Sequence, residues 1–416
     1  MAEKTASQSS TRIASIDIIR GIVMVLMAID HVRVFAGVPA GGPTPSLFFT
    51  RWVTHFCAPI FVFLAGTGAY LYGKKHGSTG ALARYLAVRG AWLVLLELTL
   101  LRFAWTFNFD YSHYMLAGVI WVIGWCMILM AALVRFPTAV IAGIGVTIIA
   151  GHNIIDRFLS QLPPLEGGLS WLWKILYFGW TVNLGPKGPV LYVLYVIVPW
   201  IGVMAAGFAF GAILRMDAAR RNRICYQLGL ASIVLFLVLR GFNLYGDPRP
   251  WSAPPRVTAG ATGTPSAPTA QPSQPQRPRM PGYLSFLNTT KYPASLLFLL
   301  MTLGPMFLAV PLLENARGPV AGVFTTFGRV PLFYYLLHIP LIHVAAIVVS
   351  LIRLGTVSPW LFTNHPMAPP RPPEGYVWSL GLLYLVWLVV VILLYFPCRW
   401  FEGLKKRNPA TWLSFL

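Results

Sequence analysis

The residues that could do chemistry lie in an apolar segment, from Ile13 to Phe35, that is long enough to span a bilayer. The segment carries Asp17, Arg20, Asp30 and His31. Such side chains are costly near the bilayer centre, so a spanning helix that keeps them normally uses them. Arg20 and His31 are three helical turns apart, on one helix face and about 16 Å apart along its axis. Because histidine exchanges its proton near neutral pH, His31 is a candidate general acid or base.

The same segment also has a structural explanation. Asp17 and Arg20 are one helical turn apart and could form an ion pair. The helix would then turn its polar face toward neighbouring helices of the protein. This alternative assigns the polar residues to packing rather than to a site.

Further polar side chains are expected to converge with His31 in the outer half of the membrane. They come from three other apolar segments and include histidines, which suit proton transfer to and from an attacking hydroxyl or amine. We expect His55 and His338 to support His31 in catalysis. A hydrogen-bonded packing role is the alternative for each of them. The other polar residues of the predicted cavity are Asp17, Asp30, Arg51, Lys291 and His343.

Arginines near the predicted cytoplasmic face are candidates for phosphate binding. We expect Arg20, Arg84 and Arg89 to hold the phosphates of a nucleotide-like donor such as coenzyme A, because guanidinium groups bind phosphate in paired geometry. The alternative is that they only set the orientation in the membrane. Glu97 is expected to pair with Arg89 or Arg102. The sequence has no Gly-rich phosphate loop and no tight pair of metal ligands, so no metal and no tightly bound cofactor is predicted.

The composition is that of a polytopic membrane protein. Of 416 residues, 56% are hydrophobic and 11% charged, and the mean hydropathy is +0.66. The net charge of +20 lies largely in short loops beside apolar segments, where the positive-inside rule explains it, so no nucleic-acid partner is predicted. The four cysteines have no paired spacing and are expected to be packing residues.

About ten spanning helices are predicted, in an all-α membrane protein. Lysines and arginines in the turns place both termini in the cytoplasm. We expect one transmembrane domain over residues 13–397. Residues 152–189 are aromatic and are expected along the interface, and the Pro/Ala/Thr-rich residues 246–282 are expected to form a disordered outer loop. The predicted spans are residues 13–35, 54–72, 83–104, 116–134, 137–151, 190–214, 224–244, 293–313, 328–352 and 377–397.

Four segments resemble a known family. They are SIDIIRGIVMVLMAIDHVRVF, FFTRWVTHFCAPIFVFLAGTGAYL, TKYPASLLFLLMTLG and FGRVPLFYYLLHIPLIH. Together they resemble the bacterial heparan-α-glucosaminide N-acetyltransferase-like membrane proteins of the transmembrane acyltransferase superfamily. Arg20 and His31 are also similar to the arginine–histidine signature of the acyltransferase-3 family, in which the histidine is implicated in acyl transfer.

The resemblance implies a bacterial inner-membrane enzyme. Acyl-CoA, in the first instance acetyl-CoA, would be its co-substrate and would enter from the cytoplasm. The acyl group would pass to a sugar or other cell-envelope acceptor on the outer side, with membrane lipids as the other partners. A transporter or permease for a small anionic or lipid-like molecule is the alternative, and a membrane protein without enzymatic activity is a third possibility. Neither the acceptor nor the oligomeric state follows from the sequence.

Overall fold

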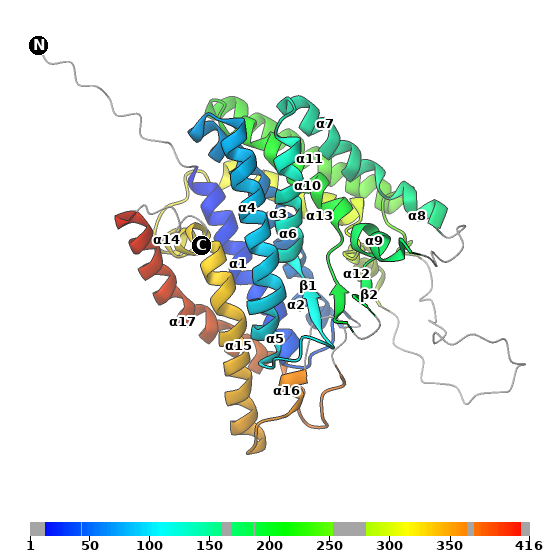
Figure 1. Cartoon of the computed structure of the whole chain (residues 1–416), viewed down its shortest axis with the longest axis vertical. Coiled ribbons are helices and arrows are strands. Elements are labelled where there is room, and N and C mark those ends of the chain that lie inside the picture. The colour runs from blue at the N-terminus through cyan, green and yellow to red at the C-terminus, as the bar shows by residue number, and fades with distance from the viewer. Residues whose placement is uncertain are drawn as a thin grey trace, which may run out of the picture.

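The protein is a bundle of long helices with a small sheet at one side (Figure 1). The structure is a computed structural model that describes residues 13–42, 44–159, 168–185, 188–252, 280–363 and 370–408. The helices are α1 (Ala14–Phe35), α2 (Pro45–Trp52), η1 (Val53–Phe56), α3 (Cys57–His76), α4 (Thr79–Leu96), η2 (Glu97–Leu101), α5 (Arg102–Thr106), α6 (Val119–Leu133), α7 (Thr138–Gly151), α8 (Ile154–Leu159), α9 (Ser170–Trp173), η3 (Lys174–Phe178), α10 (Ile197–Leu214), α11 (Ala218–Gly241), α12 (Gly282–Leu287), α13 (Leu296–Leu312), α14 (Pro319–Arg329), α15 (Pro331–Leu354), α16 (Trp360–Thr363) and α17 (Leu380–Arg407).

The prediction of an all-α membrane protein is confirmed. Each of the ten predicted spans contains a helix. Among the described residues, six helices are long and apolar enough to cross a membrane, and α6 and α13 are shorter apolar helices. The helix α1 is not among the six, because charged side chains interrupt its 22 apolar-rich residues. The four cysteines are buried free thiols, as predicted.

Two details differ from the predicted spans. The sixth span begins later than expected, because residues 190–193 form a strand and the helix α10 starts at Ile197. That strand, β3 (Val190–Val193), pairs in parallel with β1 (Met115–Ala117) and antiparallel with β2 (Trp180–Asn183). The amphipathic helix α14 lies between the eighth and ninth spans, where no helix was predicted. Of the loop predicted over residues 246–282, residues 253–279 lie outside the described part of the chain.

Helix α1 lies inside the bundle and crosses α14 at van der Waals contact. At Gly21 a Cβ atom would stand 1.9 Å from the carbonyl oxygen of Phe324, and at Gly328 it would stand 1.8 Å from that of Asp17. Only glycine allows the two backbones to approach this closely. The crossing fixes the N-terminal half of α1, and with it the residues that α1 contributes to the site.

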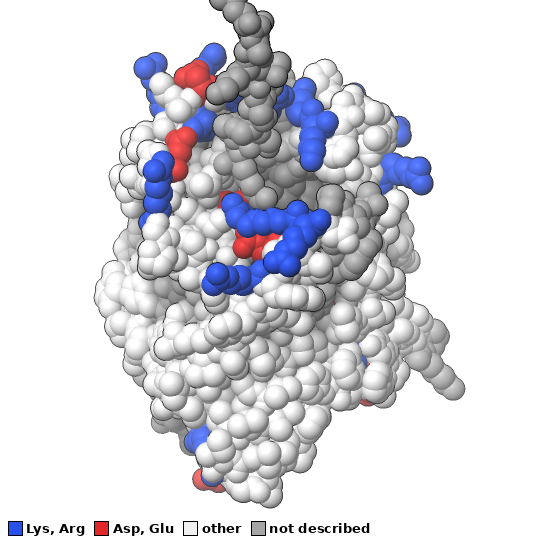
Figure 2. All heavy atoms as spheres, turned by 90° about the vertical axis from the view of Figure 1, so that its left-hand side faces the viewer, with Lys and Arg blue, Asp and Glu red and all other residues white. Residues whose placement is uncertain are grey.

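Basic residues gather toward one end of the molecule. Ion pairs join Asp17 near the start of α1, Arg329 at the end of α14 and Glu402 near the end of α17. These three segments therefore meet at one end of the bundle, which is the upper part of Figure 1. Figure 2 shows lysines and arginines concentrated in the upper part of the face that it displays, above a largely uncharged surface. The orientation in the membrane, with both termini in the cytoplasm, stays a prediction.

Candidate functional site

Three cavities adjoin one another inside the bundle. The Arg20 cavity, of about 300 Å³, is lined by residues of α1, α3, α4, α6 and α15. The His31 cavity, of about 180 Å³, shares Phe61, Val119 and Tyr335 with it. The His55 cavity, of about 290 Å³, shares four wall residues with the His31 cavity. These four are Ala40, Arg51, Lys291 and Tyr292.

His31 and His338 are in direct contact. Nδ1 of His31 lies 2.6 Å from Nε2 of His338, and the two rings stack with their centroids 4.8 Å apart. Nδ1 of His338 lies 2.6 Å from the carbonyl oxygen of Tyr335. His338 is fully buried, whereas His31 lines the cavity. The structure thus joins two residues that are 307 positions apart in the sequence.

The hydrogen-bond partners fix which nitrogen carries each proton. A carbonyl oxygen only accepts, so Nδ1 of His338 donates to Tyr335 and Nε2 of the same neutral ring accepts. Nδ1 of His31 must then be the donor to His338. This leaves Nε2 of His31 unprotonated and able to take a proton, which is the state that a general base requires.

Aromatic side chains hold the His31 ring in place. The ring of Trp105 meets it edge-on at 5.0 Å, and that of Tyr335 at 6.3 Å. Both residues line the His31 cavity, and Tyr335 also lines the Arg20 cavity. The sequence analysis identified neither Trp105 nor Tyr335 as a site residue. The position of Tyr335 one helical turn before His338 was the available signal.

The charged residues of the His31 cavity include most of those predicted for the outer half. Asp30, Arg51 and Lys291 line it together with His31. The carboxylate of Asp30 is held by Nε of Arg33 at 2.7 Å, and Arg33 also donates to the carbonyl oxygen of Val38. Asp30 is therefore committed to an ion pair within its own helix.

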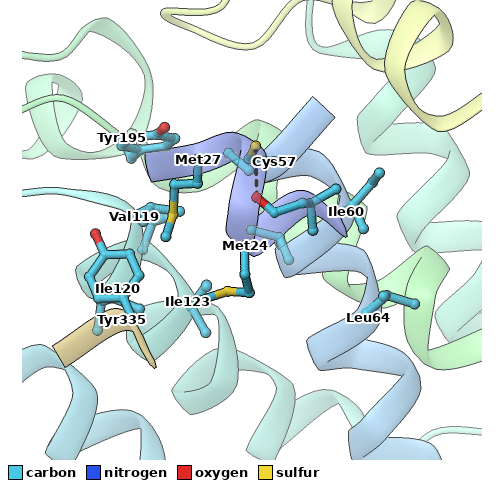
Figure 3. Close-up of a cluster of buried hydrophobic side chains, with 14 of the residues drawn as sticks. Met24, Met27, Cys57, Ile60, Leu64, Val119, Ile120, Ile123, Tyr195 and Tyr335 are labelled. Atoms are coloured by element: carbon cyan, nitrogen blue, oxygen red, sulfur yellow. Dashed lines mark hydrogen bonds between the residues drawn. The ribbon is translucent and has the colours of Figure 1, made fainter. Parts of the chain in front are cut away.

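The Arg20 cavity combines an apolar interior with two arginines. Arg20 and Arg89 line it, together with Tyr72 and Tyr85. Figure 3 shows apolar residues of this wall and of the adjoining His31 cavity: Met24 of α1 points toward Ile123 of α6 in the Arg20 cavity, and Met27, which lines the His31 cavity, points toward Val119. Arg84 is exposed and does not line this cavity. The structure therefore brings Arg20 and Arg89 together but leaves Arg84 outside.

Asp17 belongs to an ion-pair network rather than to a cavity wall. Its carboxylate lies 3.4 Å from Nη1 of Arg20 and 3.5 Å from Nε of Arg329. Arg329 also bonds Glu402 at 2.6 Å, and Lys406 reaches the same carboxylate at 2.8 Å. The alternative interpretation, in which Asp17 and Arg20 form an ion pair with a packing role, therefore accounts for Asp17. Arg20 joins this network and also lines the Arg20 cavity.

The other two histidines predicted for the site, His55 and His343, do not contact His31. His55 lines its own cavity, with Nδ1 donating to the carbonyl oxygen of Arg51 at 3.0 Å. His343 donates from Nδ1 to the carbonyl oxygen of Ala104 at 3.1 Å, and its ring stacks on Phe107 at 3.9 Å. It lines none of the three cavities.

The expected ion pair of Glu97 was wrong. The buried carboxylate accepts from the backbone N–H groups of Ile120 at 2.9 Å and Trp121 at 3.2 Å. These are free donors in the first turn of α6, which an acidic side chain satisfies well. Arg102 instead donates to loop carbonyl oxygens, including that of Tyr114. Glu97 also lines the His31 cavity.

Residues 12–244 match the family model for the catalytic domain of heparan-α-glucosaminide N-acetyltransferase. The matched range covers more than half of the chain and includes α1 to α11, and so His31, Arg20 and Arg89. No curated protein matches the chain closely enough to add a relative.

Within the described residues, no group of three or more His, Cys, Asp or Glu is placed to hold a metal ion.

Proposed function

The chain belongs to the heparan-α-glucosaminide N-acetyltransferase family, and from this we propose that it transfers an acetyl group from acetyl-CoA to a sugar or other cell-envelope acceptor. The observation that carries the proposal is the junction of the Arg20 and His31 cavities at Phe61, Val119 and Tyr335. Two substrates that approach from opposite sides of the membrane can meet there, next to a histidine held as a base.

The Arg20 cavity suits the donor. Arg20 and Arg89 can bind phosphate oxygens through charge-assisted hydrogen bonds. The apolar walls beyond them suit an extended thioester arm, which would reach the junction with its acyl carbon. The basic end of the molecule faces the cytoplasm in this proposal, which places both termini on the side where acyl-CoA is available.

The transfer step is a direct displacement at the thioester. Nε2 of His31 accepts a proton from the hydroxyl or amine of the acceptor as that group attacks the acyl carbon. A carbon–oxygen or carbon–nitrogen bond forms, the carbon–sulfur bond breaks, and His31 returns the proton to the departing thiolate. The bond from Nδ1 of His31 to His338 holds the ring in its productive orientation.

Donor turnover by the purified protein tests this proposal. In detergent or nanodiscs, the protein should consume acetyl-CoA and release free thiol when cell-envelope glycans are supplied. Arg89→Ala should raise the KM for acetyl-CoA about tenfold or more, because a hydrogen bond to a charged group contributes about 1.5–3 kcal/mol. Arg223→Ala removes an exposed arginine of α11 and is the matched control.

Intact acetyl-CoA in every condition would contradict the proposal. Movement of a labelled small anion across proteoliposomes, with no thiol released, would favour the transporter instead. Equal KM values for the Arg89→Ala and Arg223→Ala variants would remove Arg89 from the donor site.

A further inference from the structure

The His55 cavity has an unusual charge. Its walls include Arg51, Arg249 and Lys291, and no aspartate or glutamate is among the described residues that line it. The neutral part of the wall offers Asn288 and Thr289. Three cations around a space of about 290 Å³ create a positive potential inside it.

Lys291 is the clearest sign that this space is built for a ligand. Its side chain is 92% buried, at 8% exposure, and lines both the His55 and the His31 cavities. Nζ lies 5.3 Å from the centroid of the Tyr292 ring, and Asp30, in the wall of the His31 cavity, attracts the ammonium group over a longer distance. Among the described residues, no carboxylate lies within ion-pair distance of Lys291. A buried ammonium group is costly unless an oxygen partner compensates it, and a bound anion would supply that partner.

The nearby carboxylates are already committed. Asp30 is paired with Arg33. Asp247 accepts from Thr290 and Ser295 and does not line the cavity. Arg249 is fixed by two bonds to Oγ1 of Thr290, from Nε at 3.2 Å and from Nη2 at 3.1 Å. Arg249 is thus held in place at the wall. Asp30 is the carboxylate that shares the His31 cavity with Arg51 and Lys291, and no aspartate or glutamate is among the described residues that line the His55 cavity itself.

We propose that the His55 cavity binds an anionic group of the acceptor, a phosphate or a carboxylate, held between Lys291, Arg51 and Arg249. This inference rests on the proposed function and names the class of its acceptor as an anionic sugar. Arg51 and Lys291 belong to the walls of both cavities. A sugar whose charged group lies against them can therefore extend a hydroxyl or amine into the His31 cavity.

Binding measured without donor tests the inference separately from catalysis. The probes are glucose 6-phosphate, glucuronate and neutral methyl glucoside, titrated into the detergent-purified full chain. The two anionic sugars should bind at least about tenfold more tightly than methyl glucoside. Lys291→Met should weaken the anionic probes about ten- to a hundredfold and leave methyl glucoside unchanged, because it removes one charge-assisted contact.

Controls separate this site from other causes of lost binding. Lys291→Arg keeps the charge and should retain most of the binding. Lys174→Met makes the same change at a lysine that bonds the carbonyl oxygen of Thr181 outside the three cavities, and it should have no effect. Arg89→Ala should leave glucuronate binding intact, and loss of glucose 6-phosphate binding in that variant would assign the phosphate to the donor site instead.

Equal binding of neutral and anionic sugars would overturn the inference, as would unchanged binding of both anionic probes in Lys291→Met. If Lys291→Met fails to fold, Arg51→Gln applies the same test at the other cation that lines both cavities. If the anionic probes bind and Lys291→Met weakens them, but the protein never consumes acetyl-CoA, the anionic site is upheld and acetyl transfer is refuted. If the protein consumes acetyl-CoA but binds anionic and neutral sugars equally, acetyl transfer is upheld and the anionic site is refuted.

Discussion

At the scale of single residues, the site depends on a short chain of hydrogen bonds. The carbonyl oxygen of Tyr335 orients His338, and His338 orients His31. Each link has a defined direction because the first acceptor is a carbonyl group. Within this series of hydrogen bonds, His31 is thus the residue that has a ring nitrogen left to face the cavity. The roles of the two histidines should therefore differ.

We predict that His31→Ala lowers acetyl transfer by about 10²–10⁴-fold, the usual effect of removing a positioned acid–base group. His338→Ala should cause a smaller loss, because it frees the orientation of His31 without removing the base. The measurement is the release of free thiol from acetyl-CoA, together with the thermal stability of each variant. His76→Ala, at an exposed position, is the control. Full activity in His31→Ala would refute the assignment.

At the scale of helices, the close crossing of α1 and α14 decides where the site residues stand. Gly21 contacts the backbone of α14 directly, and Arg20 beside it donates to the carbonyl oxygen of Gly328 at 3.1 Å. A helix interior otherwise disfavours glycine by about 1 kcal/mol relative to alanine. The glycines at this crossing have a packing reason that outweighs this cost.

Gly21→Ala should destabilise the protein by at least about 1–3 kcal/mol, since the added methyl group overlaps a backbone carbonyl that cannot move freely. Gly322→Ala on α14 is the matched control, because its Cβ atom would meet nothing within 4 Å. It should be neutral or slightly stabilising. Thermal unfolding in detergent compares the two variants. Equal melting temperatures would show that the two helices are not in contact.

At the scale of the whole molecule, the three cavities form a series that begins near the basic end. The basic end carries the ion pairs of α1, α14 and α17, and the Arg20 cavity lies closest to it through Arg20 itself. The His31 and His55 cavities follow in series. A donor from the cytoplasm and an acceptor from the outer side would therefore meet between them.

Reporter fusions test this orientation. Fusions after Gly77 and Arg221 should read cytoplasmic, and those after Gly42 and Thr269 should read external, because the basic turns are retained on the cytoplasmic side. Alkaline phosphatase and a fluorescent protein provide opposite readouts at each position. A cytoplasmic signal at Gly42 would place the His55 cavity on the same side as the donor and would contradict transfer across the membrane.

The sequence by itself determined the membrane class and the ten helical segments, and it predicted α1 as the segment that carries site residues. These predictions depend on local signals, because the length of an apolar segment and the charged residues within it can be read directly from the sequence. Arg20 and His31 could be placed on one helix face because helical spacing is regular. The β3 strand and α14 were missed, because pairing with a distant strand and packing on α1 are not local properties.

Only the tertiary structure decided which polar residues meet. It joined His31 to His338, separated His55 into another cavity and gave His343 a packing role. It also moved Glu97 from an expected ion pair to the first turn of α6. Helix periodicity gives the face of a residue but not the neighbouring helix that this face contacts. That choice depends on close contacts such as Gly21 against α14, which set the distance and rotation of each helix in the bundle.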